Sequence, residues 1–363
     1  MRILFADLER EWRGGQSQAF LTVRGLRNSG HEVELLAARD SPLAQRAAQM
    51  GALVHQVPRF GLRAWAARAI RRLTARGGFD LVHLNEPHAV TAAWMAGTHT
   101  RLPLLFSRRI GFPLQENWVS RQRYRAIERF LPNCNEVARS LIEARIAAER
   151  MSVVYEGVEL PQPVTLEIRE SARKAWDIKE DEFLFGCTSV LVPEKGQRHL
   201  LEALPRVRAK YPRTRLLLAG DGRCRAELES HTKSLGQKEA VIFAGFVENV
   251  DRVYAALDAF VFPSEFEGTG TALQAAMAGR LPCISTARGG LNEVVENERT
   301  AIVVEPDSGE FAEAMIRLIG DEGLRKRLRA AGRDEIEKKF SAEQMVKNTI
   351  RVYEDVLTKW RAR

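Results

Sequence analysis

The sequence has few cysteines and no long hydrophobic run. Its four cysteines lie 37 to 59 residues apart, a spacing that fits neither a metal site nor a redox pair, so we expect reduced thiols and no bound metal. A membrane-spanning helix is excluded, because no run of about 18 apolar residues is present. Residues 1–7 are too short and polar for a signal peptide. These absences predict a cytoplasmic protein.

Lysine is absent from residues 1–160, which contain 23 Arg against 15 Asp and Glu. The whole net charge of +8 therefore lies in this Arg-rich half, and the remainder of the chain is balanced. Attraction to an anionic partner is expected of this half alone, with anionic lipid or a phosphorylated acceptor as candidates. A solvated surface without a partner is the simpler alternative. Nucleic acid is not expected, because no aromatic-interleaved basic motif or zinc knuckle is present.

A length of 363 residues, 45% of them hydrophobic, is enough for two globular domains. Short apolar runs alternate with helical segments in both halves, which is typical of parallel sheets covered by helices. We expect strands at 2–7, 31–37, 79–84, 102–107, 152–160, 183–190, 215–219, 240–244, 259–263, 281–285 and 301–304.

This pattern predicts an α/β fold of two doubly wound, Rossmann-like domains, at 1–162 and 163–342. The Pro-containing stretch 161–164 is the candidate linker. A C-terminal helix, 343–363, is expected to pack back on the first domain. The default ligand site of such a pair is a cleft between the domains, at the carboxyl ends of the strands.

Three loops in the second half carry residues suited to a phosphate-linked sugar. Lys195 follows a strand and can reach a phosphate as a point charge, and Gly222 permits a tight turn after the next strand. Glu267 precedes a turn with glycines that let the backbone approach an anion and hydroxyls at a helix N-terminus. The residues of that turn are Gly268, Thr269, Gly270 and Thr271. A plain helix cap is the alternative interpretation of this turn.

In the first half, Gly14 and Gly15 lie between the first strand and its helix, but without the G-x-G-x-x-G spacing of a dinucleotide fingerprint. This absence argues against a nicotinamide oxidoreductase. His88 follows a later strand and is a candidate catalytic residue, with a packed, hydrogen-bonded histidine as the alternative. Arg108 and Arg109 follow another strand and are candidates for binding an anionic acceptor, with a structural ion pair as the alternative.

Read together, these motifs resemble glycosyltransferase family 4, whose members are retaining enzymes of the GT-B fold. The resemblance covers nearly the whole chain, and it rests on Gly14-Gly15, 30–33, 80–83, 153–158, 193–196, 219–222, 243–245, Pro263-Ser264, Glu267-Gly268, 276–278, Gly289-Gly290 and 293–295. The loop that begins with Arg108 and Arg109 is similar to an envelope-polysaccharide or lipopolysaccharide subgroup.

The resemblance implies a nucleotide-diphosphate sugar as donor, a glycan or lipid-linked acceptor, and neither cofactor nor metal. Lys195 would balance the diphosphate charge, and Glu267 would bind the hydroxyls of the sugar. Phe246 and Val247 would contact the base. The remaining donor-binding residues would be Gly14, Gly15, Gly222, Gly268, Thr269, Gly270, Thr271 and Gln274. The departing phosphate would accept the acceptor's proton, so that stabilising the diphosphate becomes the main catalytic contribution.

The chain departs from the family pattern at two positions. Ala275 replaces a second acidic residue that usually holds the ribose, and Val190 replaces an arginine before the Lys-Gly turn. A lost charge-assisted hydrogen bond is worth roughly 1.5–3 kcal/mol, so donor binding is weakened unless Gln274 or Arg198 substitutes. A weak or inactive sugar-nucleotide-binding member of the family is therefore the alternative function.

Residues 61–76 form a basic amphipathic pattern, with Trp65 and Ile70 on the apolar side and five arginines over the rest. Such a helix can lie in an anionic membrane interface, or it can pack on the core with a solvated Arg face. Four arginines between residues 121 and 129 have the same ambiguity. A peripheral position on the inner face of the cytoplasmic membrane is therefore an alternative to a purely cytoplasmic one.

Overall fold

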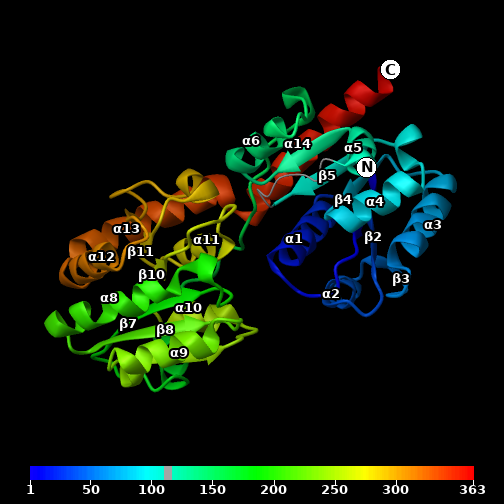
Figure 1. Ribbon diagram of the computed structural model, residues 1–363. Coiled ribbons are helices and arrows are strands. Elements are labelled where there is room, and N and C mark those ends of the chain that lie inside the picture. Colours follow the sequence, from blue (N-terminus) through cyan, green and yellow to red (C-terminus); the bar gives the residue numbers. More distant parts are fainter. Residues whose placement is uncertain (110–116) are drawn as a thin grey trace. The chain divides into compact units, whose positions relative to one another are not determined.

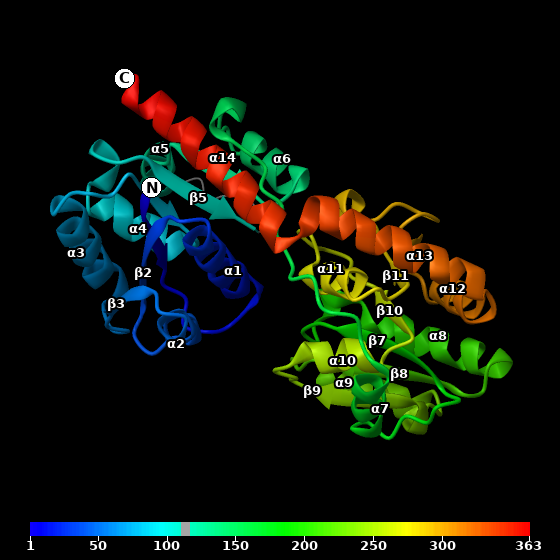
Figure 2. The same ribbon diagram turned by 180° about the vertical axis from the view of Figure 1, so that it is seen from behind.

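The computed structural model describes residues 1–109 and 117–363, and the chain forms two compact units (Figures 1 and 2). The first unit contains Met1–Gly157 together with the returning segment Ser341–Arg363. The second unit is continuous, Val158–Phe340. Each unit is built on its own six-stranded sheet, and within the described residues the strands of both sheets pair in parallel.

The first sheet has the strand order β3-β2-β1-β4-β5-β6. Its strands are β1 (Arg2–Asp7), β2 (Glu32–Ala38), β3 (Leu53–Val57), β4 (Leu81–Leu84), β5 (Leu104–Arg108) and β6 (Arg129–Pro132). Successive side chains of β1 point to opposite faces, so Ile3 and Phe5 join one hydrophobic cluster and Leu4 and Ala6 join another. Both faces of this sheet are therefore buried.

Helices cover the two faces of the first sheet separately. One cluster is completed by α1 (Gly14–Asn28), α2 (Pro42–Gln49) and α14 (Ala342–Arg361). The other is completed by α3 (Leu62–Ala75), α4 (Pro87–Met95), α5 (Trp118–Arg125) and α6 (Asn135–Glu143). Two short 3-10 turns, η1 (Thr98–Thr100) and η2 (Ala148–Arg150), complete the unit.

The last helix, α14, is fixed to the first sheet by a buried hydrogen bond. The hydroxyl of Tyr353 pairs with Nδ1 of His83 on β4, and Nε2 of His83 lies 2.8 Å from Oγ of Ser107 on β5. Burial lowers the pKa of His83 to about 3, so its ring is neutral at physiological pH. His83 is thus a packed, hydrogen-bonded residue that ties the C-terminal helix to the sheet.

The second sheet has the order β12-β11-β10-β7-β8-β9. Its strands are β7 (Phe183–Thr188), β8 (Thr214–Ala219), β9 (Val241–Gly245), β10 (Ala259–Phe262), β11 (Cys283–Ser285) and β12 (Ile302–Val303). Its helices and turns are α7 (Leu166–Lys174), η3 (Pro193–Lys195), α8 (Gln197–Lys210), α9 (Arg225–Ser234), η4 (Lys238–Ala240), α10 (Val250–Ala256), α11 (Thr271–Ala278), η5 (Gly289–Glu293), α12 (Ser308–Gly320), α13 (Glu322–Glu335) and η6 (Ile336–Phe340).

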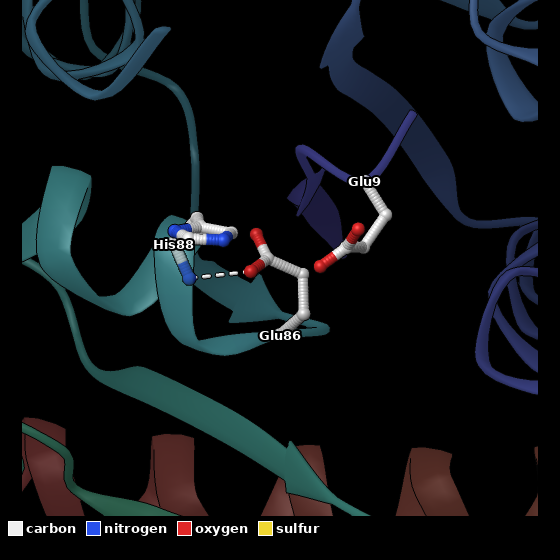
Figure 3. A group of neighbouring side chains, drawn as sticks. All are labelled: Glu9, Glu86 and His88. Carbon is white, nitrogen blue, oxygen red and sulfur yellow. Dashed lines mark hydrogen bonds between the residues drawn. The ribbon is translucent and has the colours of Figure 1, made fainter. Parts of the chain in front are cut away.

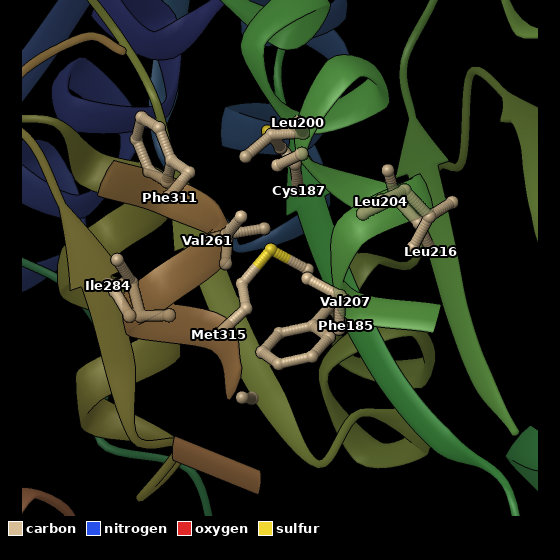
Figure 4. Packing of buried hydrophobic residues seen from close by; sticks show 14 of the residues in the cluster. Phe185, Cys187, Leu200, Leu204, Val207, Leu216, Val261, Ile284, Phe311 and Met315 are labelled. Atoms are coloured by element: carbon tan, nitrogen blue, oxygen red, sulfur yellow. The ribbon is translucent and has the colours of Figure 1, made fainter. Parts of the chain in front are cut away.

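One face of this sheet packs against α8 and α12 (Figure 4). Phe185 and Val261 from the strands meet Met315 and Phe311 from α12, and all four side chains are at most 1% exposed. A fully buried side chain of this size contributes roughly 1.5–3 kcal/mol. The rigid sheet that results holds the loops at its carboxyl edge in place.

Three sequence-based predictions need correction. Residues 152–160 do not form a strand; they run beside β6, where Ser152 N and Val154 N donate to the carbonyls of Phe130 and Pro132, and then leave the sheet. Strands β3 and β6 were not anticipated. In α3, Trp65 is 51% exposed rather than part of the buried stripe, which consists of Ala66, Ala67, Ile70 and Thr74.

The described residues, 1–109 and 117–363, include no helix with both the length and the apolarity needed to span a bilayer. The four cysteines are free thiols. Burial raises the pKa of Cys187 to about 12, so this thiol stays protonated.

Candidate functional site

In the second sheet the strand order reverses between β7 and β10, which are neighbours although they are distant in sequence. Ligands of open α/β sheets bind beyond the carboxyl ends of the strands at such a reversal. The loop after β7 carries Lys195, and the loop after β10 carries Glu267. The fold therefore brings together two residues that are 72 positions apart in the sequence.

Lys195 and Glu267 form an ion pair through Nζ and Oε1. Oγ of Ser264 lies 3.3 Å from the same carboxylate oxygen. The two charged side chains are 19% and 16% exposed, so the pair is shielded from water without being sealed off from it. A cation and a carboxylate held in this way can serve a ligand that contains both phosphate and hydroxyl groups.

Two glycines allow three loops to close around Glu267. Gly196 has φ +63°, and a Cβ there would lie 2.2 Å from the carbonyl oxygen of Pro263. Gly289 has φ +62°, and a Cβ there would lie 2.3 Å from the carbonyl oxygen of Glu267. A side chain at either position would push the loops apart, because it would meet backbone atoms. The position of Glu267 thus depends on these glycines.

The turn after Glu267 presents a helix N-terminus. Gly270, with φ +61°, is the N-cap of α11 and offers no side chain to the first N–H groups of the helix, which favour an anion. Thr269 and Gln274 are buried, and Nε2 of Gln274 donates to the carbonyl of Thr269 at 3.2 Å. Gln274 therefore supports the turn from behind, while Gly268 and Thr271 are partly exposed.

The neighbouring strands bring the remaining candidates of the second unit to the same edge. Gly222 follows β8 and packs so tightly that a Cβ would lie 2.3 Å from the carbonyl oxygen of Leu191. Phe246 and Val247 follow β9, and the side chain of Phe246 is 75% exposed. An exposed aromatic ring at this edge is available to stack on a base.

Arg198 does not take the place of the arginine that Val190 replaces. Its guanidinium pairs with Glu202 at 2.9 Å and with Glu227 at 3.2 Å. Val190 itself is 49% exposed.

In the first sheet the order reverses between β1 and β4, and Gly14 and Gly15 begin α1 directly after β1. Among residues 1–109 and 117–363, no atom would lie within 4 Å of a Cβ at either glycine, and neither glycine has a left-handed φ. Neither packing nor backbone conformation therefore requires glycine here. The open space is what a ligand close to the backbone would use.

A buried polar network holds this part of the first unit together. Asp7, at the end of β1, accepts hydrogen bonds from Nδ2 of Asn85 at 2.6 Å and Nε2 of Gln16 at 3.2 Å. Nδ2 of Asn85 also lies 3.2 Å from the carbonyl oxygen of Gly15. Burial raises the pKa of Asp7, and the two amides act against that rise. The network fixes the start of α1 against the ends of β1 and β4.

Arg109 has internal partners. Its Nε lies 3.1 Å from the carboxylate of Glu156, and its Nη1 donates to the carbonyl of Asn85 at 3.2 Å. The side chains of Arg109 and Glu156 are 16% and 11% exposed. Arg109 thus forms the structural ion pair that was the alternative to acceptor binding. Arg108 is also buried. The continuation of this loop, 110–116, lies outside the described residues.

His88, Glu86 and Glu9 lie close together at the carboxyl ends of β1 and β4 (Figure 3). Glu86 caps α4, and its carboxylate accepts from the backbone N–H groups of Leu8, His88 and Ala89. Burial, with Asp7 adding to it, raises the pKa of Glu86 to about 8. Glu86 is therefore largely a neutral carboxylic acid at pH 7.

The tautomer of His88 follows from its contact with Arg63. Nε of Arg63 donates to Nδ1 of His88 at 3.0 Å, so the proton of the neutral ring is on Nε2. Burial and the charge of Arg63 lower the pKa of His88 and keep the ring neutral. The ligand atoms of Glu9, Glu86 and His88 lie within 4.8 Å of one another, but a protonated Nε2 offers no lone pair to a metal. His88 thus presents a hydrogen-bond donor.

Two family models match the chain in succession. Residues 12–162 match the model "Glycosyltransferase Family 4", and residues 168–335 match "Glycosyl transferases group 1". The first match contains Gly14, Gly15 and His88, and the second contains Lys195 and Glu267. The chain belongs to glycosyltransferase family 4.

The curated relatives of this chain are distant. It is 28% identical over 211 residues to an uncharacterized glycosyltransferase of Methanocaldococcus jannaschii, covering 56% of this chain and 54% of that one. It is 26% identical to the putative glycosyltransferase YtcC of Bacillus subtilis, covering 95% and 89%. A GDP-mannose-dependent monoacylated alpha-(1-6)-phosphatidylinositol monomannoside mannosyltransferase of Corynebacterium glutamicum is 32% identical, covering 50% of each chain. The chain thus spans about half the length of the first and third of these relatives.

Solved structures show the fold. The chain superimposes on Anabaena HepE in complex with UDP and glucose with a TM-score of 0.85, at 19% identity, covering 98% of this chain and 99% of that one. The apo form of the lipopolysaccharide outer core galactosyltransferase WaaB gives a TM-score of 0.70 at 18% identity, covering 99% of each chain. These likenesses identify the fold of the chain as GT-B.

Several residues that hold the candidate site residues in place were not given this role from the sequence. Asp7 and Asn85 hold the Gly15 turn, Ser264 contacts Glu267, and Arg63 fixes His88. Asp7 could have been found, since a carboxylate that ends a buried first strand is unusual. The contact of Arg63 with His88 joins residues 25 apart on different helices and leaves no pattern in the sequence.

We predict that Arg63→Gln raises the pKa of His88 toward its ordinary value of about 6.5. Glutamine can still donate to Nδ1 but lacks the positive charge that disfavours protonation of the ring. An NMR titration of the His88 ring protons measures the shift. Arg139→Gln, an exposed change on α6, is the control. An unchanged or lower pKa in Arg63→Gln would contradict the assignment.

Proposed function

We propose that the protein transfers a sugar from a nucleotide-diphosphate donor to an envelope glycan or glycolipid acceptor, with retention of the anomeric configuration. The observation that carries this proposal is the Lys195–Glu267 pair beside the uncapped N-terminus of α11, at the strand reversal of the second sheet. One site there offers a cation, bare N–H groups and a carboxylate. A diphosphate joined to a polyhydroxyl ring needs this combination.

In this proposal the second unit stabilises the charge that develops on the departing diphosphate. The ammonium of Lys195 and the first N–H groups of α11 would bind that charge, and such preorganised groups supply much of an enzyme's rate enhancement. Glu267 accepts hydrogen bonds from sugar hydroxyls. The ion pair with Lys195 keeps both charges partnered, which avoids the cost of a buried lone charge.

The leaving phosphate takes the proton of the acceptor, so the proposed reaction needs neither a protein nucleophile nor a metal. The first unit contributes His88, whose Nε2–H donates a hydrogen bond, and Gly14 and Gly15, whose open space leaves room for the donor. Arg108 and Arg109 keep their proposed role toward the acceptor, with Arg109 acting from within its ion pair with Glu156.

The proposed acceptor class is supported by the relatives and by the charge of the first unit. The Corynebacterium relative is named for a phosphatidylinositol mannoside and WaaB for the lipopolysaccharide outer core. Phosphatidylinositol carries an anionic phosphate, and the Arg-rich half of this chain has a complementary charge.

We expect that Lys195→Met and Glu267→Gln each lower kcat/KM for transfer by about 10²–10³-fold, because each removes stabilisation of the transition state. The donor is chosen beforehand by a thermal-shift panel of UDP, GDP, ADP and CMP, in which the nucleotide that raises the unfolding temperature most identifies the base. Lys338→Met, an exposed change in the second unit, should leave kcat/KM unchanged.

NMR of the first product formed gives its anomeric configuration, and activity in EDTA tests independence of metal. A failure of every nucleotide to stabilise the protein would instead indicate a non-catalytic member of the family.

Gly15→Ala is expected to raise the KM for the donor while leaving stability unchanged or slightly higher. Its methyl group would enter open space that the donor is proposed to occupy, and alanine favours the first turn of α1. Gly196→Ala is the contrasting variant, since its Cβ would meet the Pro263 carbonyl and lower the thermal unfolding temperature. Donor kinetics at wild-type values in Gly15→Ala would argue against a ligand at this turn.

We further propose that the first unit binds anionic membrane surfaces through α3, at the inner face of the cytoplasmic membrane. Ala66, Ala67 and Ile70 of this helix face the core, and its arginines and Trp65 are left outward. We expect binding to anionic vesicles to fall with salt and with the double change Arg68→Gln and Arg72→Gln. The reason is that each basic residue near an anionic membrane surface contributes about 1 kcal/mol to binding. Co-sedimentation measures it, and equal binding to neutral vesicles would contradict the proposal.

A further inference from the structure

A pocket of about 860 Å³ lies at the carboxyl edge of the first sheet. The loops after β1 and β3, the first turn of α3 and residues along the length of α4 line it. We propose that this pocket binds the phosphate of a phosphorylated acceptor. This inference rests on the proposed function, and it adds residues that bind the acceptor's phosphate to the acceptor contacts proposed for Arg108 and Arg109.

The charge of the pocket is unbalanced. Four arginines line it together with two carboxylates, Glu9 and Glu11. Arg13 is paired with Glu11. Over residues 1–109 and 117–363, the other three arginines bond only to neutral groups. These arginines are Arg10, Arg59 and Arg63. Three guanidinium groups against the single carboxylate of Glu9 favour an anionic ligand.

Two of these guanidinium groups are held in place by the backbone. Nη2 of Arg10 donates to the carbonyl of Arg59 at 2.5 Å, and Nε of Arg59 donates to the carbonyl of Arg39 at 3.1 Å. Since a guanidinium has five N–H donors, these contacts leave several free for a ligand. Planar groups fixed in this way bind phosphate oxygens in pairs and lose little side-chain entropy on binding.

The same pocket has an apolar part. Phe60 is 93% exposed and Met95 is 53% exposed, and both line the pocket with Leu62. An inorganic anion would leave these side chains in water, whereas a phosphate ester covers them with the group that it carries. His88 lines the pocket as well, and its Nε2–H places a hydrogen-bond donor beside the ligand. The ligand chemistry is thus a phosphate ester of a lipid or of a saccharide.

The test measures binding to the full chain by calorimetry with three probes: hexyl phosphate, glucose 6-phosphate and uncharged hexyl glucoside. At least one phosphate should bind at least about tenfold more tightly than hexyl glucoside. The double change Arg59→Gln and Arg63→Gln should weaken phosphate binding by about tenfold or more, since each charged hydrogen bond lost is worth roughly 1.5–3 kcal/mol. Arg139→Gln, on α6 of the same unit, should leave it unchanged.

The order of the probes identifies the source of the phosphate: tighter hexyl phosphate indicates a lipid, and tighter glucose 6-phosphate indicates a saccharide. Equal binding of the uncharged probe overturns the proposal, as does equal weakening by Arg139→Gln. Repeating the titration with saturating nucleotide separates this pocket from the donor site. If the nucleotide abolishes phosphate binding, the proposal is overturned as well. Phosphate binding without any response to nucleotides would leave the pocket standing while the proposed transferase function fails.

Discussion

The reversal of strand order is the constraint on which both candidate sites depend. Parallel strands need a crossover, and at the reversal the crossovers of two neighbouring strands leave toward opposite faces of the sheet. In the first unit, α1 after β1 and α4 after β4 pack in different hydrophobic clusters. Because the two connecting segments diverge there, the carboxyl edge stays open, and the side chains of both loops face the same space.

The divergence of the two connecting segments alone would leave only a gap at the carboxyl edge. Close backbone contacts bring the loops together there and form a site. In the second unit, Gly196 and Gly289 bring three loops to van der Waals distance around Glu267. In the first unit, buried polar groups centred on Asp7 do the same work with hydrogen bonds. One site is thus defined mainly by the absence of side chains and the other by their pairing. Both hold charged or polar groups in positions that are fixed before a ligand arrives.

The sequence predicted the central strands, the two sheets and the loops that bear Lys195 and Glu267, because short apolar runs followed by glycine-containing turns are strong signals. The edge strands of the first sheet, β3 and β6, were harder to predict. Strand β3 is only partly buried, and β6 has four residues, including Arg129, whose burial depends on Asp355 in α14. The run 152–160 looked like a strand because it is apolar, but most of it has no neighbouring strand to pair with. Arg109 and Arg63 acquired their roles from partners that no local pattern reveals.

The C-terminal helix has a consequence for how the chain is made. Helix α14 supplies Met345, Val346, Tyr353, Val356 and Leu357 to the core of the first unit, although Val158–Phe340 separates it from the rest of that unit. On the ribosome, the second unit is therefore complete in sequence before the first one is. The nascent first unit must wait, with part of one face of its sheet uncovered, until α14 has been made, and domains usually fold as whole units. Biosynthesis thus reverses the order of completion that the numbering of the chain suggests.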